Sequence, residues 1–289
     1  GTIYKNTIRW LARYQSEFSD VPVVPIDLTR KDRTVAYNPL RYREGADPGV
    51  IVRNFVEAIG VATGESDTSK TARFSKWASG AFRLLYQNKM TISDAYLLFD
   101  RGLAELRRRL LDNVNHPMTR RNWEAMDLLS ASVLEDKIES TLSRFHPFVE
   151  TEAMATAFGQ NDVSFDFAEA IRGGHIVLVN LSLEGENISS KDAAIFGSFL
   201  LSDLWQSAQG RIGKGESGEK KPFYVYLDEF QEFITPTISK TLAQASGFGL
   251  HFILSHQYPQ QLLDSGPDGE KVWHSIENNV GNMIAFSTT

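Results

Sequence analysis

The sequence predicts an α/β protein in which a largely parallel sheet is flanked by helices and interrupted by an all-helical segment. Short apolar runs typical of buried strands occur near the N-terminus and again after residue 174, with helical patterns between them. From about residue 47 to residue 150 the strand signals disappear, and only helical periodicity remains. The 289 residues are 42% hydrophobic and 23% charged, as in ordinary globular domains.

The N-terminal part is expected to form one helix followed by one strand. Ile8, Leu11, Tyr14 and Phe18 are spaced along one face of a helix. The run Val21–Ile26 is typical of a strand, and its two prolines favour an edge or irregular strand because proline cannot donate to the ladder. Asn38-Pro39 then predicts a turn.

The middle of the chain is expected to be entirely helical. Pro48 opens a helix that runs through Ile59, and Phe74, Trp77 and Leu84 share one face of the next. Thr91 and Asp94 resemble a capping box at the start of a helix through Leu111. Apolar positions from Trp123 to Phe145 predict one further long helix. We expect these tryptophans, with Phe199 and Trp205, to lie in the core.

Strands and helices alternate in the C-terminal part, which favours right-handed crossovers and parallel pairing. The expected strands are His175–Asn180, Phe223–Leu227, Leu250–Ser255 and Met283–Phe286. The expected helices span residues 191–209, 238–247 and about 269–277. Thr235-Pro236 is typical of a helix start, with a hydroxyl at the N-cap and proline at the first helical position. Residues 1–44 and 151–289 are therefore assigned to the α/β core, and residues 45–150 to an inserted all-helical domain.

Two adjacent carboxylates at the end of one predicted strand are the most informative feature. The run Phe223–Leu227, which we expect to be buried on both faces, ends in Asp228 and Glu229. Open α/β sheets bind ligands at the carboxyl ends of their strands. An Asp that holds the water shell of Mg²⁺, followed by a Glu that polarises water, is the chemistry of a Walker B strand. A strand that ends in a solvated acidic turn is the alternative.

Composition excludes several other functions. There is no cysteine, so disulfides, thiolate metal sites and cysteine nucleophiles are absent. No apolar run reaches the roughly 20 residues that span a bilayer. The six histidines show no His-Glu-x-x-His spacing, so no direct metal site is expected. The net charge of −6 means that nucleic acid could bind only to a local basic face.

A local basic face is available in the helical segment. Arg107, Arg108 and Arg109 are consecutive, and Arg120 and Arg121 follow shortly after. These arginines are candidates for contacts with DNA phosphates. The alternative is a solvated helix face on which they pair with Glu105, Asp112 and Glu124.

Several segments in a fixed order resemble a known family. They are Tyr37–Leu40, Gly174–Ser182, Phe223–Gln231, Ile238–Gly249, Leu250–Leu262 and Asn279–Phe286. In combination they resemble the motor domain of type IV secretion coupling proteins and related conjugative ATPases (TraG- and TraD-like) of the HerA–FtsK superfamily of P-loop NTPases. The likeness covers residues 21–40 and 164–289. The helical segment matches that family's inserted all-α domain in position and length.

The resemblance implies a RecA-like core that assembles as a homo-hexamer and uses ATP and Mg²⁺ to move DNA, nucleoprotein or protein substrates. It places Asp228 and Glu229 at the Walker B pair, Gln257 at the residue that senses the γ-phosphate, and Gln231 in the same nucleotide-binding motif. It also implies secretion-system partners and a cytoplasmic location at the inner membrane, through a segment not contained in this chain.

The sequence departs from this family in its phosphate-binding loop. No G-x-x-x-x-G-K-[ST] occurs, so we expect that loop to lie upstream of Gly1 and this chain alone to be inactive. Gly64–Thr71 has the spacing of such a loop but carries Ser69 in place of the second glycine. In Gly213–Lys220, Glu219 interrupts the Gly-Lys pair. Ser246 stands where the family often has an arginine, so no arginine finger is assigned.

Two other functions remain open at this stage. The chain could be a scaffold without hydrolytic activity, whose helical segment binds DNA or a secretion substrate. It could also be a related HerA-like motor with another task, such as DNA processing.

Overall fold

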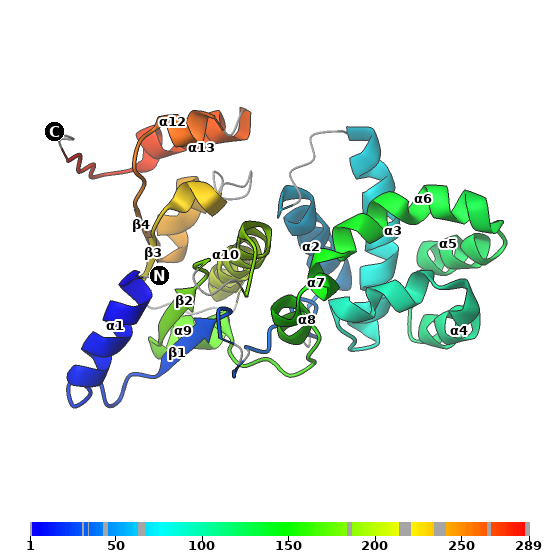
Figure 1. Cartoon of the computed structure of the whole chain (residues 1–289), viewed down its shortest axis with the longest axis horizontal. Coiled ribbons are helices and arrows are strands. Elements are labelled where there is room, and N and C mark those ends of the chain that lie inside the picture. Colours follow the sequence, from blue (N-terminus) through cyan, green and yellow to red (C-terminus); the bar gives the residue numbers. More distant parts are fainter. Residues whose placement is uncertain are drawn as a thin grey trace. The chain divides into compact units, whose positions relative to one another are not determined.

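The computed structural model describes residues 2–30, 32–33, 35–42, 46–62, 68–183, 187–213, 221–233, 241–264 and 267–286 (Figure 1). This part of the chain is mostly helical and contains two small parallel sheets. It divides into two compact units. The first holds residues 1–166 and 175–199, and the second holds residues 167–174 and 200–289. The division into an α/β core and an inserted domain at residues 45–150 stays a prediction.

The first unit contains one of the two sheets and most of the helices. Its sheet pairs β1 (Val23–Asp27) with β2 (Ile176–Asn180) in parallel, with Asp27 opposite Asn180. Its helices are α1 (Thr2–Arg13), α2 (Pro48–Ala62), α3 (Thr68–Gln87), η1 (Ile92–Phe99), η2 (Arg101–Leu103), α4 (Ala104–Asp112), α5 (Pro117–Asp127), α6 (Ala131–Phe145), α7 (Pro147–Glu150) and α8 (Glu152–Phe158).

Aromatic side chains form much of the core of this unit. Helix α3 packs against α2, α5 and α6 (Figure 1). Phe82 of α3 contacts Phe55 of α2 at 4.5 Å and Phe145 of α6 at 5.2 Å between ring centroids. The expected burial of the tryptophans Trp77 and Trp123 is confirmed. Such aromatic pairs add to the large apolar area that each ring buries.

The second unit contains the sheet that carries the two adjacent carboxylates. Strand β3 (Phe223–Leu227) runs parallel to β4 (Leu250–Leu254), with Leu227 opposite Leu254. The other elements are α9 (Phe167–Gly173), η3 (Phe230–Phe233), η4 (Ala245–Phe248), α12 (Gln260–Leu263) and α13 (Pro267–Asn279). Helix α10 (Ser190–Gly213) belongs to the first unit up to Phe199 and to the second from Leu200.

Three expectations about individual helices and strands are wrong. The apolar positions from Trp123 to Phe145 lie on two helices, α5 and α6, because Ser130 between them has an extended backbone (ψ 159°). The segment after Thr91 begins with η1 and η2 and becomes an α-helix only at Ala104, because Asp100 is extended (ψ 121°). Met283–Phe286 forms no strand, since no strand in the described part of the chain pairs with it.

The expected burial of β3 on both faces is also wrong. Tyr224 and Tyr226 are 57% and 74% exposed, whereas the alternate residues Phe223, Val225 and Leu227 are half-buried. Side chains alternate between the two faces of a strand, so one face of this sheet points to solvent. Both strand pairs are parallel, as expected. Their joining into one larger sheet stays a prediction.

Candidate functional site

The candidate site lies where β3 and β4 end. The strands are parallel and in register, so Asp228 and Ser255 follow them at the same edge of the sheet. Two backbone hydrogen bonds join these ends: Ser255 N–H donates to Leu227 O at 2.9 Å, and Phe230 N–H donates to Ser255 O at 3.1 Å. The segments that carry the polar side chains are therefore fixed to each other by the main chain.

Asp228 is held by the strand next to it. The hydroxyl of Ser255 donates a hydrogen bond to Asp228 Oδ1 at 2.6 Å. The carboxylate is exposed. Among the described residues, its other oxygen accepts no hydrogen bond. An exposed carboxylate of this kind can accept hydrogen bonds from the water shell of a hydrated cation.

Glu229 is held at both carboxylate oxygens. Gln257 Nε2 donates to Oε1 at 2.9 Å, and Gln231 Nε2 donates to Oε2 at 2.9 Å. The backbone of Glu229 has φ 51°, in the left-handed region that non-glycine residues rarely adopt. Such backbone outliers cluster at functional sites, where the surrounding structure maintains them. The structure therefore brings Asp228, Glu229, Gln231 and Gln257 together.

A small hydrophobic core packs against the strand ends that carry the site. Phe230, directly after Glu229, is fully buried and packs with Leu262, Val272 and Ile276. Leu227 and Leu254, the last residues of the two strands, are partly buried against this cluster. The ring of His256 packs edge-on against Phe230, with the centroids 5.5 Å apart. Leu227 and Phe230 thus flank Asp228 and Glu229, and their packing fixes the backbone that carries the two carboxylates.

Ser255 is the residue that sequence reasoning missed. It was expected only as the last residue of a strand, yet it is the hydrogen-bond donor to Asp228. A usable signal was present, because a hydroxyl residue that directly follows one parallel strand lies beside the residue that follows its neighbour.

The residues at this edge fit a hydrated magnesium ion and a nucleotide phosphate. Asp228 offers an exposed carboxylate, and Gln257 offers an amide, the kinds of group that bind metal-bound water and phosphate oxygens. In the described ranges no cluster of three or more His, Asp or Glu residues could hold a metal ion directly.

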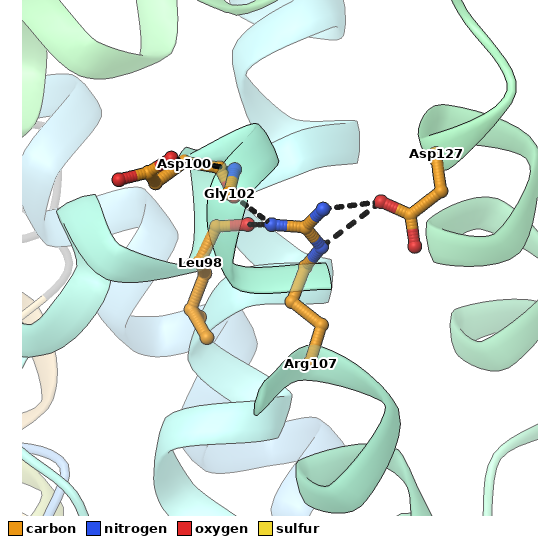
Figure 2. Close-up of polar contacts among 5 residues, drawn as sticks. All are labelled: Leu98, Asp100, Gly102, Arg107 and Asp127. Carbon is orange, nitrogen blue, oxygen red and sulfur yellow. Dashed lines mark hydrogen bonds and ion pairs between the residues drawn. The ribbon is translucent and has the colours of Figure 1, made fainter. Parts of the chain in front are cut away.

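Arg107 is not available to DNA, which corrects one of the candidate phosphate contacts. Its side chain is 1% exposed, and Figure 2 shows the guanidinium between Asp127 and the start of η2. Nε donates to Asp127 Oδ1 at 3.1 Å and NH1 to Leu98 O at 3.1 Å, with further bonds to Asp127 and to Asp100 O. Because the guanidinium is buried in this network, it links η1, α4 and α5 and cannot contact a DNA phosphate.

The other candidate arginines are at the surface. Arg108 and Arg109 are exposed, and both pair with Glu105. Arg120 is half-exposed and pairs with Asp112 at 3.4 Å. Arg121 is exposed. The pairing with Glu105 and Asp112 is what the alternative of a solvated helix face anticipates, and it reduces the net positive charge that a phosphate would meet.

Other polar features fall outside this site. Asp27, at the end of β1, accepts hydrogen bonds from Thr29 N–H at 3.0 Å and from Asn180 Nδ2 at 3.0 Å, and so closes a turn. Three segments singled out in the sequence lie wholly or partly outside the described residues: the first half of Gly64–Thr71, nearly all of Gly213–Lys220, and Thr235-Pro236. A search of the described residues found no helix with the length and apolar character of a membrane span.

Comparisons with known proteins identify the fold. No family model and no curated protein matches the chain. Among solved structures, the unbound monoclinic form of the bacterial conjugative coupling protein TrwB aligns with a TM-score of 0.53 at 13% identity, over 93% of this chain and 63% of that one. TrwB in complex with ADP and Mg²⁺ aligns with a TM-score of 0.53 at 12% identity, over 91% of this chain and 64% of that one.

The solved structures extend well beyond this chain. It spans less than two thirds of their length, and at these identities the likeness concerns the fold alone. The sequence resemblance to coupling proteins covers residues 21–40 and 164–289, whereas the structural alignment covers 93% of the chain. The chain therefore has the fold of the bacterial conjugative coupling protein TrwB.

Proposed function

We propose that this chain is part of an ATP-driven motor that moves DNA, nucleoprotein or protein through a type IV secretion or conjugation system. The observation that carries the proposal is the convergence of Asp228, Glu229 and Gln257 at the carboxyl edge of a parallel strand pair, in a chain with the coupling-protein fold. The TrwB structures with ADP and Mg²⁺ and with a GTP analogue support nucleotide as the ligand.

Each residue is assigned one role in nucleotide hydrolysis. Asp228, oriented by Ser255, binds the water shell of Mg²⁺. Glu229 orients and polarises the water that attacks the γ-phosphate. Gln257 follows β4 and reports the γ-phosphate through its amide, and Gln231 belongs to the same site. Bound Mg²⁺ would neutralise charge that develops on the phosphates during hydrolysis.

The wider proposal concerns the complete protein. We propose that both strand pairs belong to one RecA-like sheet, that residues 45–150 form an all-helical insertion, and that the complete protein assembles as a homo-hexamer at the inner membrane with other secretion-system components. Arg108, Arg109, Arg120 and Arg121 stay the proposed DNA contacts of the helical segment. Support for this wider proposal comes from the resemblance to coupling proteins and from the fold.

The first prediction tests the catalytic assignment in the full-length protein. Glu229→Gln keeps the size of the side chain but removes the carboxylate, so we expect ATP turnover to fall by about 10²–10⁴-fold, the usual contribution of a positioned acid or base. Nucleotide binding should be retained. Steady-state phosphate release and equilibrium nucleotide binding are the measurements.

Glu270→Gln is the matched control, because Glu270 is an exposed glutamate on α13 of the same unit. It should leave turnover unchanged. Wild-type turnover in the Glu229→Gln protein would refute the assignment, and a full-length protein that binds no nucleotide would favour the scaffold.

A further inference from the structure

The two amides that hold Glu229 occupy both of its oxygens. Gln231 donates to Oε2 and Gln257 donates to Oε1, each at 2.9 Å. An ionised carboxylate can only accept hydrogen bonds, so the nitrogen of each amide must face it. Among the described residues, Gln231 Oε1 is buried and accepts no hydrogen bond, so Glu229 alone determines how this amide is turned. Each carboxylate oxygen has a further lone pair, and Glu229 is exposed, so a water molecule can donate to it beside either amide.

The two amides differ in how they are attached. Gln231 lies two residues after Glu229 in the same segment, and its side chain is half-buried. Gln257 is exposed and lies in a bend after β4, 28 residues away along the chain. A shift of the segment after β4 would break the bond from Gln257. The bond from Gln231 would survive it, because Gln231 and Glu229 move together.

The backbone keeps Glu229 and Gln231 in this relation. Glu229 has a left-handed backbone, and the next residue, Phe230, is fully buried with its N–H bonded to Ser255 O. Phe230 is the one residue between Glu229 and Gln231, and its buried ring fixes the chain at that point. The left-handed conformation turns the chain sharply there, which allows side chains two residues apart to meet.

We propose that Gln231 is a positioning residue that holds Oε2 of Glu229 in place, while Oε1, bound by the more distant Gln257, is the oxygen that accepts a hydrogen bond from the attacking water molecule. If the bond from Gln257 breaks, the carboxylate stays in place because Oε2 remains bound to Gln231. This inference rests on the proposed function.

The first experiment needs neither nucleotide nor turnover. In ¹⁵N-labelled chain, the side-chain NH₂ signals of Gln231 and Gln257 are assigned by Gln→Met variants and followed in Glu229→Ala. Both signals should move. The signal of Gln260, which makes the same kind of bond to Asp264 at 2.9 Å, should not. An unmoved Gln231 signal would show that its amide does not hold Glu229, and the proposal would fail.

The second experiment measures turnover by the full-length protein. Gln231→Met keeps the length of the side chain but removes the donor, so kcat should fall about 10-fold, within the contribution of a positioned acid or base. KM should stay within twofold. In a Glu229→Gln background the same substitution should have no further effect, because residues that act through one group are not additive. Gln260→Met is the control and should behave as wild type.

The possible failures are distinguishable. If Glu229→Gln abolishes turnover but Gln231→Met matches wild type, the positioning role is refuted and the proposed function stands. If Gln231→Met lowers kcat equally in both backgrounds, Gln231 acts independently of Glu229, and the inference is again refuted. Wild-type turnover in Glu229→Gln would refute the proposed function itself. The NMR experiment still decides the contact if the variant enzyme does not fold.

Discussion

Arg107 shows how one residue in a run of like charges can have a different role from its neighbours. Consecutive residues on a helix point about 100° apart, so three adjacent arginines cannot all face the same way. Arg107 lies four residues before the buried Leu111 and shares its inward face, whereas Arg108 and Arg109 face solvent. Helical periodicity alone therefore predicts that Arg107 faces the core and does not belong to the local basic face.

We predict that Arg107→Ala destabilises the first unit by about 3 kcal/mol, because it removes the guanidinium donor from the carbonyls of Leu98 and Asp100 and leaves Asp127 without its cation. Urea denaturation followed by circular dichroism measures the loss. Arg108→Ala is the matched control and should change stability by less than about 0.5 kcal/mol, because its pair with Glu105 is exposed. Equal effects of the two substitutions would contradict the structural role of Arg107.

At the candidate site, the sequence predicts which residues are polar and where strands end, but not how the side chains meet. Asp228 and Glu229 are expected because they follow a strand, at the edge where open α/β sheets bind ligands. Gln257 is expected from the resemblance to coupling proteins. The bonds from Ser255 and Gln231, and the left-handed backbone of Glu229, were not expected. They depend on rotamers and on a φ angle that the packing of Phe230 maintains.

Among the secondary-structure elements, local chemistry predicts the starts of helices better than their ends. The capping box at Thr91 is confirmed: the carboxylate of Asp94 accepts hydrogen bonds from both the N–H and the hydroxyl of Thr91, each at 2.9 Å. The helix type after it was wrong, because Asp100 leaves the helical conformation and caps Gly102 N–H at 2.8 Å.

We predict that Asp94→Ala lowers the stability of the first unit by about 1 kcal/mol, since it removes the acceptor for two donors of the buried Thr91. Chemical denaturation checks this value. Glu139→Ala, an exposed position within α6, serves as the control and should have a smaller effect. If the two variants unfold at the same denaturant concentration, the capping box contributes nothing to stability.

Strands were predicted well where a neighbouring strand exists. Phe223–Leu227 forms β3 as expected, and Leu250 opens β4 as expected. Met283–Phe286 has the same apolar character but has no pairing strand among the described residues. A strand is completed by hydrogen bonds to another segment, so an apolar run alone predicts only the capacity to pair.

For the molecule as a whole, the sequence predicts a helical segment between parallel α/β elements, and the described structure contains both. It does not predict where the compact units divide, because a division depends on contacts between residues far apart in sequence. The two parallel pairs, β1–β2 and β3–β4, illustrate this limit. Each pair follows from its own apolar runs, whereas their joining into one larger sheet stays a proposal.

The stability of the whole chain should fall as pH rises above 10. Burial and the nearby Asp27 raise the pKa of Tyr4 above its ordinary value of 10.0, and burial raises the pKa of Tyr96 in the same direction. The unfolded chain therefore loses these protons first and binds fewer protons than the folded chain at such pH. The free energy of unfolding of the protein therefore decreases as the pH rises.

Tyr96→Phe tests this pH dependence. It removes one of the two titrating phenols, so the loss of stability between pH 9 and about pH 11, measured by urea denaturation, should be smaller than in wild type. At pH 7 the variant should lose about 1 kcal/mol, because Tyr96 donates a hydrogen bond to Leu142 O at 2.9 Å. Tyr226→Phe, at an exposed tyrosine, should follow the wild-type curve, and an unchanged slope in Tyr96→Phe would contradict the prediction.

The exposed face of β3 has a practical consequence for biophysical assays. Tyr224 and Tyr226 point to solvent, and Ile284 and Phe286 of the C-terminal segment are more than four fifths exposed. Environment-sensitive dyes that fluoresce on apolar surfaces should bind the native chain before any heating. Dye-based melting curves would then start from a bright baseline, and intrinsic tryptophan fluorescence or calorimetry would be the better readout.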